Sequence, residues 1–250
     1  MIRILNKAAS KFEYKLVKNI SEPGPDMIAD NNFMKLYQLC RPYTMTSPER
    51  LFALYQAVQY VVNNNIPGDF VECGVWKGGS SMMIARVLQS MGIADRVIWM
   101  YDTYEGMTEP TADDKDYQGV EAGKLLNTSD KSDSNSVWCY SSLEEVQSNL
   151  QKTGYPESFI KYVKGKVEES IPGQMPGSVA LLRLDTDWYA STYHEMTYLY
   201  PILETRGVLI IDDFGHWEGA KKAILQYFDE HKLYPLMNRI DNTGRLVIKS

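Results

Sequence analysis

Residues 69–81, DFVECGVWKGGSS, decide the fold. The apolar run over 69–74 is typical of a buried strand that enters a turn, and residues 80–91 are predicted to form the next helix. A strand, a glycine-rich turn and a helix in this order indicate a βαβ unit with a nucleotide-type ligand over the turn. Turn glycines also occur without a ligand. We therefore infer the ligand from the position of Gly74 and Gly78 between the strand and the helix.

The same alternation continues on both sides of this stretch. Further helices are expected at residues 48–62, 143–153, 192–204 and 218–231. Further strands are expected at residues 96–102, 160–164, 178–185, 207–213 and 245–249. Strands that alternate with helices form mostly parallel sheets, and continuous apolar strands indicate a sheet covered on both faces. The sequence therefore predicts an α/β fold with helices on both faces of a mostly parallel sheet.

Two regions stand apart from this alternation. Residues 1–40 are expected to form an N-terminal helical arm, interrupted by the chain breaker SEPGPD at 21–26, and residues 41–250 to form the domain. Residues 103–140 are polar and turn-rich, and loops of this length are usually lids or substrate-binding loops. Aromatic residues of the arm suggest a homo-oligomer: Phe12, Tyr14, Phe33 and Tyr37.

Composition argues against several classes of protein. The 250 residues are 44% hydrophobic, and 26 basic against 32 acidic residues give a net charge of −6. No basic run is present, which disfavours nucleic acid as a partner, and no apolar run is long enough to span a membrane. The three cysteines lie far apart, which excludes a disulfide framework and favours a cytoplasmic protein.

Polar residues gather where strands are expected to end, the edge at which parallel sheets bind ligands. The candidates for a cofactor site are Glu72, Gly74, Ser80, Ser81, Asp102 and Thr103, with Trp138 as a residue that flanks an adenine. Asp102 is placed to accept hydrogen bonds from ribose hydroxyls, although a turn or capping role is an alternative. The G-x-G-x-x-G pattern of dinucleotide enzymes is missing, which favours a cofactor without phosphates.

Three more carboxylates follow two other strands. Asp185 ends one strand, and Asp212 and Asp213 end another. Carboxylates brought close together repel one another and need a cation or protons, and oxygen ligands suit a hard divalent ion such as Mg²⁺, Mn²⁺ or Ca²⁺. The alternative is that these residues cap the helices that follow.

Asp187 is a candidate general base. It lies two residues after Asp185 and is therefore expected on the same side of the strand end. Capping of the next helix is the alternative role. His194 and His216 are competing bases, although a lone histidine is more often structural.

Several long motifs together resemble the macrocin O-methyltransferase (TylF/MycF-like) family. The matching stretches include FVECGVWKGGSS (70–81), YDTYEGMTEPT (101–111), LLRLDTDWYAST (181–192) and GVLIIDDFGHWEGAKKA (207–223), with weaker matches at 41–51 and 162–172. The resemblance runs from about Arg41 to the C-terminus and does not cover the N-terminal arm.

The resemblance implies a class I methyltransferase (Rossmann-like) fold and methyl transfer from S-adenosylmethionine (SAM) to a sugar hydroxyl of a small-molecule glycoside, with Mg²⁺ or Mn²⁺. Carried onto this chain, it makes Asp185, Asp212 and Asp213 the metal ligands and Asp187 the base. Related catechol-type enzymes use a lysine where this chain has Trp188. The aspartate is therefore the better candidate for the base.

Two other classes of protein remain as alternatives on the same architecture. An NAD-dependent oxidoreductase is disfavoured by the missing G-x-G-x-x-G pattern and by the lack of a Tyr-x-x-x-Lys pair. A non-catalytic nucleotide-binding protein is disfavoured because such a protein does not require four aspartates at two strand ends. The ligand that raises the melting temperature, S-adenosylhomocysteine or NAD, distinguishes the classes.

Overall fold

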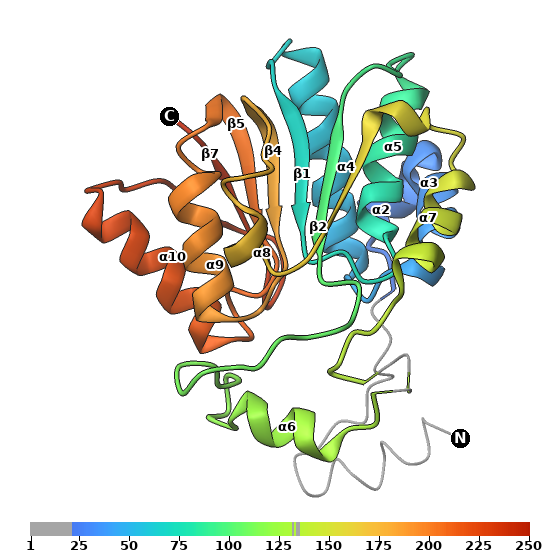
Figure 1. Ribbon diagram of the computed structural model, residues 1–250. Coiled ribbons are helices and arrows are strands. Elements are labelled where there is room, and N and C mark those ends of the chain that lie inside the picture. The colour runs from blue at the N-terminus through green and yellow to red at the C-terminus, as the bar shows by residue number, and fades with distance from the viewer. Residues whose placement is uncertain (1–21, 132, 134–135) are drawn as a thin grey trace, which may run out of the picture.

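A seven-stranded sheet forms the centre of the computed structural model, which describes residues 22–131, 133 and 136–250 (Figure 1). Its strands are β1 (Asp69–Cys73), β2 (Ile98–Asp102), β3 (Ile160–Lys164), β4 (Val179–Leu184), β5 (Leu203–Ile211), β6 (Asn238–Arg239) and β7 (Arg245–Ile248). Their order across the sheet is β3-β2-β1-β4-β5-β7-β6. The first five strands pair in parallel and β7 runs antiparallel to β5, which confirms the mostly parallel sheet.

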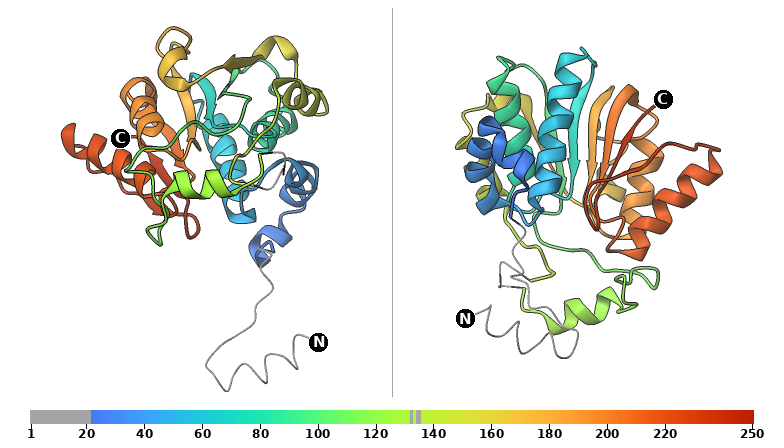
Figure 2. Two further views of the ribbon diagram at one scale, coloured as in Figure 1. Left: turned by 60° about the horizontal axis from the view of Figure 1, so that its bottom comes forward. Right: turned by 180° about the vertical axis from the view of Figure 1, so that it is seen from behind.

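Helices cover both faces of this sheet (Figure 2). One face carries α2 (Pro25–Ala29), α3 (Asn31–Cys40), α4 (Pro48–Asn63), α5 (Gly79–Ser90) and α7 (Leu143–Gln151). The other face carries α8 (Val167–Ser170), α9 (Tyr189–Tyr198) and α10 (Glu218–Glu230). Successive strand residues point to opposite faces, so in β1 Phe70 packs into the first hydrophobic core and Val71 into the second. This explains the continuous apolar strands.

The element boundaries agree with the sequence where local signals are strong. The side chain of Ser47 accepts a hydrogen bond from the backbone N–H of Arg50 at 3.1 Å, and Pro48 begins helix α4 as expected. The helix expected at 192–204 instead begins at Tyr189 and ends at Tyr198. Pro201 disfavours its continuation, and the chain enters β5 at Leu203.

The division expected at residue 40 does not coincide with an edge of the core. Residues 1–21 lie outside the described residues, but helix α3 packs against α4 and α5. Phe33 is fully buried in the first core and Tyr37 is nearly so. These two aromatic rings are therefore not available for the homo-oligomer that they suggested, and the oligomeric state stays a prediction.

The segment 103–140, here called the lid segment, lies beyond the carboxyl ends of the central strands (Figures 1 and 2). Its sequence predicted a loop, and it contains one short helix, α6 (Ala122–Thr128). Ala122 and Leu126 are buried with Trp188 and Trp217 in a third hydrophobic cluster. The lid segment therefore has a packed interface with the domain.

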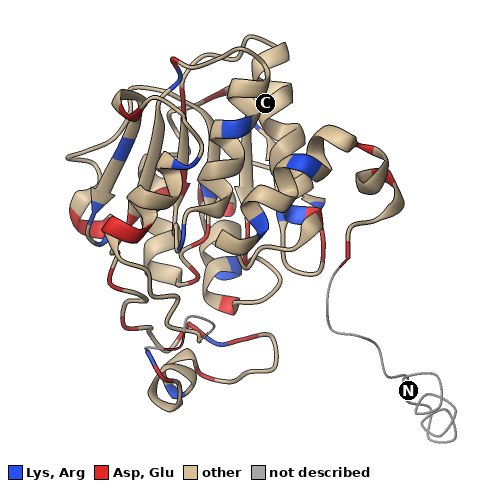
Figure 3. Ribbon diagram, turned by 90° about the vertical axis from the view of Figure 1, so that its right-hand side faces the viewer, with Lys and Arg blue, Asp and Glu red and all other residues tan. Residues whose placement is uncertain are grey.

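Two observations bear on the partners of the protein. Among the described residues, no helix is both long enough and apolar enough to cross a membrane. Acidic and basic residues are interspersed along the elements seen in Figure 3, without a continuous basic band on that side. That nucleic acid is not a partner stays a prediction from the sequence.

Candidate active site

A cavity of about 380 Å³ opens at the carboxyl ends of the strands. Its walls come from the turns after β1, β2, β4 and β5, from the residues that precede α4, and from the lid segment. Expected site residues that line it are Glu72, Gly74, Ser80, Asp102, Thr103, Asp185, Asp187, Asp212 and Asp213. The fold therefore brings together residues from four separate strand ends.

The turn after β1 requires glycine because two backbones approach closely there. Gly74 has a φ of +81°, and a Cβ atom at this position would lie 2.0 Å from the carbonyl oxygen of Asp185. Gly78 has a φ of +86°, and a Cβ atom at this position would clash with the side chain of Leu150. The backbone after β1 therefore lies directly against the backbone that carries the acidic motif of β4.

Replacing Gly74 with Ala should destabilise the protein by about 2 kcal/mol or more, because a left-handed backbone and a steric clash add together. Gly92→Ala is the matched control, since Gly92 has a φ of +76° but open space around its Cα. The measurement is urea unfolding of both variants, with calorimetric titration of S-adenosylhomocysteine. Equal stability losses in the two variants would show that close approach of the backbones is unimportant.

Asp102 has a structural task in addition to its place in the cavity. Its Oδ2 accepts hydrogen bonds from the backbone N–H groups of Val75 at 2.7 Å and Trp76 at 3.2 Å. Its Oδ1 accepts from the N–H of Tyr104 at 2.7 Å. Thr103 donates its hydroxyl to the carbonyl of Gly106 at 2.6 Å. The turn role that was the alternative for Asp102 is thus present, and a contact of Asp102 with a ribose stays a prediction.

Glu72 and the serines of the glycine turn form a buried hydrogen-bonded group. The Ser81 hydroxyl donates to Oε2 of Glu72, and the guanidinium of Arg183 donates to Oε1 at 2.8 Å. Burial raises the pKa of Glu72, while Arg183 opposes this shift. Ser81 is fully buried and is not among the residues that line the cavity, whereas Ser80 is.

Trp138 is held by other residues of the lid segment. Its indole N–H donates to the backbone carbonyls of Leu126 at 3.1 Å and Ser129 at 3.3 Å. Its ring packs against the third hydrophobic cluster, and the residues that line the cavity are its neighbours Val137 and Cys139. Trp138 therefore stabilises the lid segment, and its contact with an adenine stays a prediction.

Three carboxylates form an acidic cluster in the cavity. Oxygen atoms of Asp185, Asp187 and Asp213 all lie within 4.8 Å of one another. Burial and the neighbouring negative charges raise the pKa values of Asp185 and Asp213 well above the ordinary range, and burial raises the pKa of Asp187 to about 7. Asp213 Oδ2 is buried and accepts no hydrogen bond from the described residues. Such a cluster needs a cation or protons.

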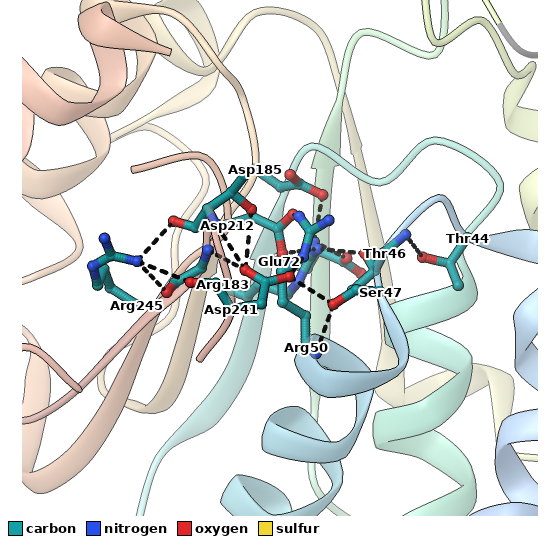
Figure 4. A network of polar contacts seen from close by, with 12 residues as sticks. Thr44, Thr46, Ser47, Arg50, Glu72, Arg183, Asp185, Asp212, Asp241 and Arg245 are labelled. Carbon is teal, nitrogen blue, oxygen red and sulfur yellow. Dashed lines mark hydrogen bonds and ion pairs between the residues drawn. The ribbon is translucent and has the colours of Figure 1, made fainter. Parts of the chain in front are cut away.

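Asp212 differs from the other members of the expected metal set because it contacts two arginines (Figure 4). Arg183 donates to its Oδ1 at 2.6 Å, and Arg50 forms a short ion pair with its Oδ2. Arg50 also lies 3.1 Å from Asp241, in the turn between β6 and β7. The expected set of Asp185, Asp212 and Asp213 and the observed acidic cluster therefore differ in one member.

Neither arginine was expected at the site from the sequence. Arg183 stands within the apolar run LLRLD, and a cation in a fully buried strand is a signal that it needs nearby anions. Arg50 gave no comparable signal, because a charged residue in the first turns of a helix is ordinary. Only the fold shows that it faces a strand end 162 residues later.

The two histidines occupy different environments. His194 makes a hydrogen-bonding contact of 3.0 Å with the carbonyl of Ile171, which fixes it outside the acidic cluster. His216 lines the cavity, beside Trp217 and the ring of Tyr117. Burial lowers the pKa of His216. Of the two competing bases, His216 is therefore the one that the structure places near the site.

Comparisons with known proteins agree with this architecture. The family model described as macrocin-O-methyltransferase (TylF) matches residues 40–248. A tetracenomycin rhamnosyl 4'-O-methyltransferase from Streptomyces olivaceus is 33% identical over 202 residues, which are 81% of this chain and 74% of the relative. The mycinamicin III 3''-O-methyltransferase of Micromonospora griseorubida is 29% identical, over 81% of this chain and 76% of the relative.

Solved structures support the same assignment. The O-methyltransferase NovP superposes with a TM-score of 0.72 at 28% identity, covering 83% of this chain and 82% of that one. The calicheamicin methyltransferase CalS11, at 14% identity and a TM-score of 0.58, shares the fold over 94% of this chain and 97% of that one. The sheet is the class I methyltransferase fold, and the chain belongs to the macrocin O-methyltransferase (TylF) family of SAM-dependent O-methyltransferases.

Proposed function

We propose that this enzyme transfers the methyl group of SAM to a sugar hydroxyl of an uncharged small-molecule glycoside, with Mg²⁺ or Mn²⁺ held at the acidic cluster. The relatives named above methylate sugar residues of tetracenomycin and mycinamicin compounds. The observation that carries the proposal is the half-buried cluster of Asp185, Asp187 and Asp213, in which one oxygen of Asp213 has no hydrogen-bond partner among the described residues.

The side chains at the cluster fit a hard divalent cation. They offer oxygen ligands, and their mutual repulsion favours a positive charge between them. We assign the ligands as Asp185, Asp212 and Asp213. Asp212 already accepts from Arg50 and Arg183, but a carboxylate has about four lone-pair sites and retains two of them. Asp212 also lines the cavity.

The turn after β1 fits SAM. Glu72, Gly74, Ser80, Asp102 and Thr103 line one end of the cavity and would hold the cofactor there. When bound, SAM supplies an activated methyl group, and the cation supplies charge that lowers the pKa of a nearby hydroxyl.

The chain's own residues then have separate tasks. Asp187 accepts the proton of the acceptor hydroxyl as the methyl group is transferred. Its backbone φ of +66° is rare for an aspartate, and residues held in such conformations cluster at functional sites. Met107 and Val137 of the lid segment and Trp217 line the cavity and exclude water. Correct alignment of oxygen, carbon and sulfur supplies much of the rate enhancement.

The charge of the cavity favours an uncharged acceptor. Seven carboxylates line it: Glu72, Asp102, Glu168, Asp185, Asp187, Asp212 and Asp213. Two permanent cations, Arg50 and Lys166, line it with them. The buried guanidinium of Arg183 also pairs with Glu72, Asp185 and Asp212. Carboxylates still outnumber the cations, which favours a sugar already attached to a neutral compound over a nucleotide sugar.

Calorimetric titration with S-adenosylhomocysteine, in Mg²⁺ and again in EDTA, tests the cofactor assignment first. Micromolar binding is expected in both buffers, because the cation is assigned to the acceptor rather than to the cofactor. An acceptor screen then compares neutral glycosides with nucleoside diphosphate sugars in the presence of Mg²⁺. Binding of NAD instead of S-adenosylhomocysteine, or methylation of nucleotide sugars alone, would contradict the proposal.

A further inference from the structure

A buried carboxylate of the lid segment, Asp114, contacts the beginning of helix α9. Its Oδ1 accepts a hydrogen bond from the backbone N–H of Tyr189, the first residue of the helix, at 2.7 Å. Its Oδ2 accepts from the N–H and the hydroxyl of Thr111 at 2.6 and 2.9 Å. The side chain is fully buried. Asp114 therefore satisfies a helix N–H group that would otherwise lack a partner, where the helix dipole favours an anion.

The same carboxylate packs against the beginning of helix α10. A Cβ atom on Gly219, the second residue of that helix, would lie 2.0 Å from Asp114 Oδ1. The next lid residue, Lys115, accepts a hydrogen bond from the N–H of Glu218 at 2.8 Å through its backbone carbonyl. The lid segment is thus attached to two neighbouring helix starts at one point, and Gly219 provides the space for it.

These two helix starts directly follow the acidic motifs of the site. Asp187 lies two residues before Tyr189, and Asp213 lies four residues before Trp217. The rings of Trp188 and Trp217 are 4.9 Å apart in an edge-to-face arrangement, and the indole N–H of Trp188 donates to the lid carbonyl of Thr108 at 3.1 Å. The lid segment and the two acidic motifs therefore form one packed unit.

We propose that Asp114 is a positioning residue for methyl transfer: it docks the lid segment on α9 and α10 and thereby fixes the backbone that presents Asp187 to the acceptor. The left-handed backbone at Asp187 is unfavourable by itself and persists only where surrounding contacts hold it. Asp114 supplies such a contact two residues away. The inference rests on the proposed function only for the role of Asp187 as the base.

Two substitutions disturb this contact from opposite sides. Asp114→Asn keeps the shape of the side chain, but its amide group has a single acceptor oxygen and therefore cannot accept from both Tyr189 and Thr111. Gly219→Ala displaces the carboxylate while introducing a residue that helices favour. We expect kcat to fall about 10-fold in the first variant and about 100-fold in the second, since small displacements of reacting groups have effects of this size.

Matched controls are available for both variants. Asp113→Asn changes the neighbouring aspartate, whose ion pair with Lys222 lies on the surface with both side chains about half exposed. Gly123→Ala introduces a methyl group in α6 at ordinary contact distance from Pro110. Both controls are expected to keep kcat and lid stability within twofold of the wild type.

The experiment measures tryptic cleavage within the lid segment, where the Lys124 side chain is 72% exposed, together with kcat, KM and the dissociation constant of S-adenosylhomocysteine. Cleavage of the Asp114→Asn and Gly219→Ala variants should be at least ~10-fold faster, because local opening becomes easier. Cofactor affinity should stay within threefold. Cleavage at the wild-type rate, or faster cleavage with unchanged kcat, would overturn the inference.

The cleavage assay separates this inference from the proposed function, because it needs no acceptor and no cofactor. A protein that binds no S-adenosylhomocysteine yet shows faster cleavage in both variants would contradict the proposed function while supporting the docking role of Asp114. Wild-type cleavage in a protein that binds the cofactor would contradict the docking role alone.

Discussion

Replacing Asp187 with Asn is expected to lower kcat by about 10²–10⁴-fold while leaving Mg²⁺ affinity within threefold of the wild type. The substitution preserves the size of the side chain but removes the proton acceptor. Asp187 lines the cavity beside Asp185 and Asp213, two of the ligands assigned above. Initial rates of methyl transfer and calorimetric titration with Mg²⁺ measure the two quantities separately.

Asp213→Asn is the comparison variant, because it removes an assigned metal ligand rather than the base. Asp213 has an unpartnered buried oxygen, so loss of its charge should reduce Mg²⁺ affinity at least ~100-fold and abolish turnover, as EDTA should in the wild type. Binding of S-adenosylhomocysteine should persist in both variants. If Asp187→Asn loses Mg²⁺ affinity to the same extent, Asp187 is a ligand and His216 becomes the candidate base.

The Asp212→Asn variant then tests whether Asp212 is the third metal ligand. The resemblance to the family places Asp212 in the metal set, whereas the structure gathers Asp185, Asp187 and Asp213. Reduced Mg²⁺ affinity in a folded Asp212→Asn variant supports the assigned set. Unchanged affinity with reduced stability would show that Asp212 serves only Arg50 and Arg183.

The strand ends could be predicted from the sequence because each apolar run stops at a polar motif. Gly74, Asp102, Asp185 and Asp213 reach one cavity because parallel strands end at the same edge. The partners of these residues could not be predicted in the same way. Arg50 contacts Asp212 where a helix packs beside the sheet. The two residues lie far apart in the sequence, so no local pattern predicts their contact.

The lid segment shows the same limit. Its length and polarity predicted a loop over the site, but its attachment depends on Asp114, one of several aspartates in a polar stretch. Trp138 was expected beside an adenine because it lies in that loop. In the structure its N–H group donates to the carbonyls of Leu126 and Ser129, partners that the sequence did not indicate. Side-chain partners inside a loop follow from its path, which sequence periodicity does not define.

Arg183 is expected to be the most important single side chain for stability. It is 2% exposed, and its two terminal nitrogens donate to Glu72 at 2.8 Å, Asp185 at 2.7 Å and Asp212 at 2.6 Å. The hydroxyl of Thr46 accepts a fourth hydrogen bond at 3.1 Å. One guanidinium thus joins β1, β4, β5 and the residues before α4, as Figure 4 shows.

Replacing Arg183 with Met should lower the free energy of unfolding by about 3–5 kcal/mol, because it leaves buried carboxylates without their counter-charge. Arg183→Lys should have an intermediate effect, since an ammonium keeps the charge but not the fork that reaches three carboxylates. Arg206→Met is the control: Arg206 is exposed and donates to Asn64 at 2.7 Å, so its loss should cost less than about 0.5 kcal/mol. Urea unfolding in EDTA measures all three variants. A loss in Arg183→Met no larger than that in Arg206→Met would show that the carboxylates do not depend on Arg183 and bind protons instead.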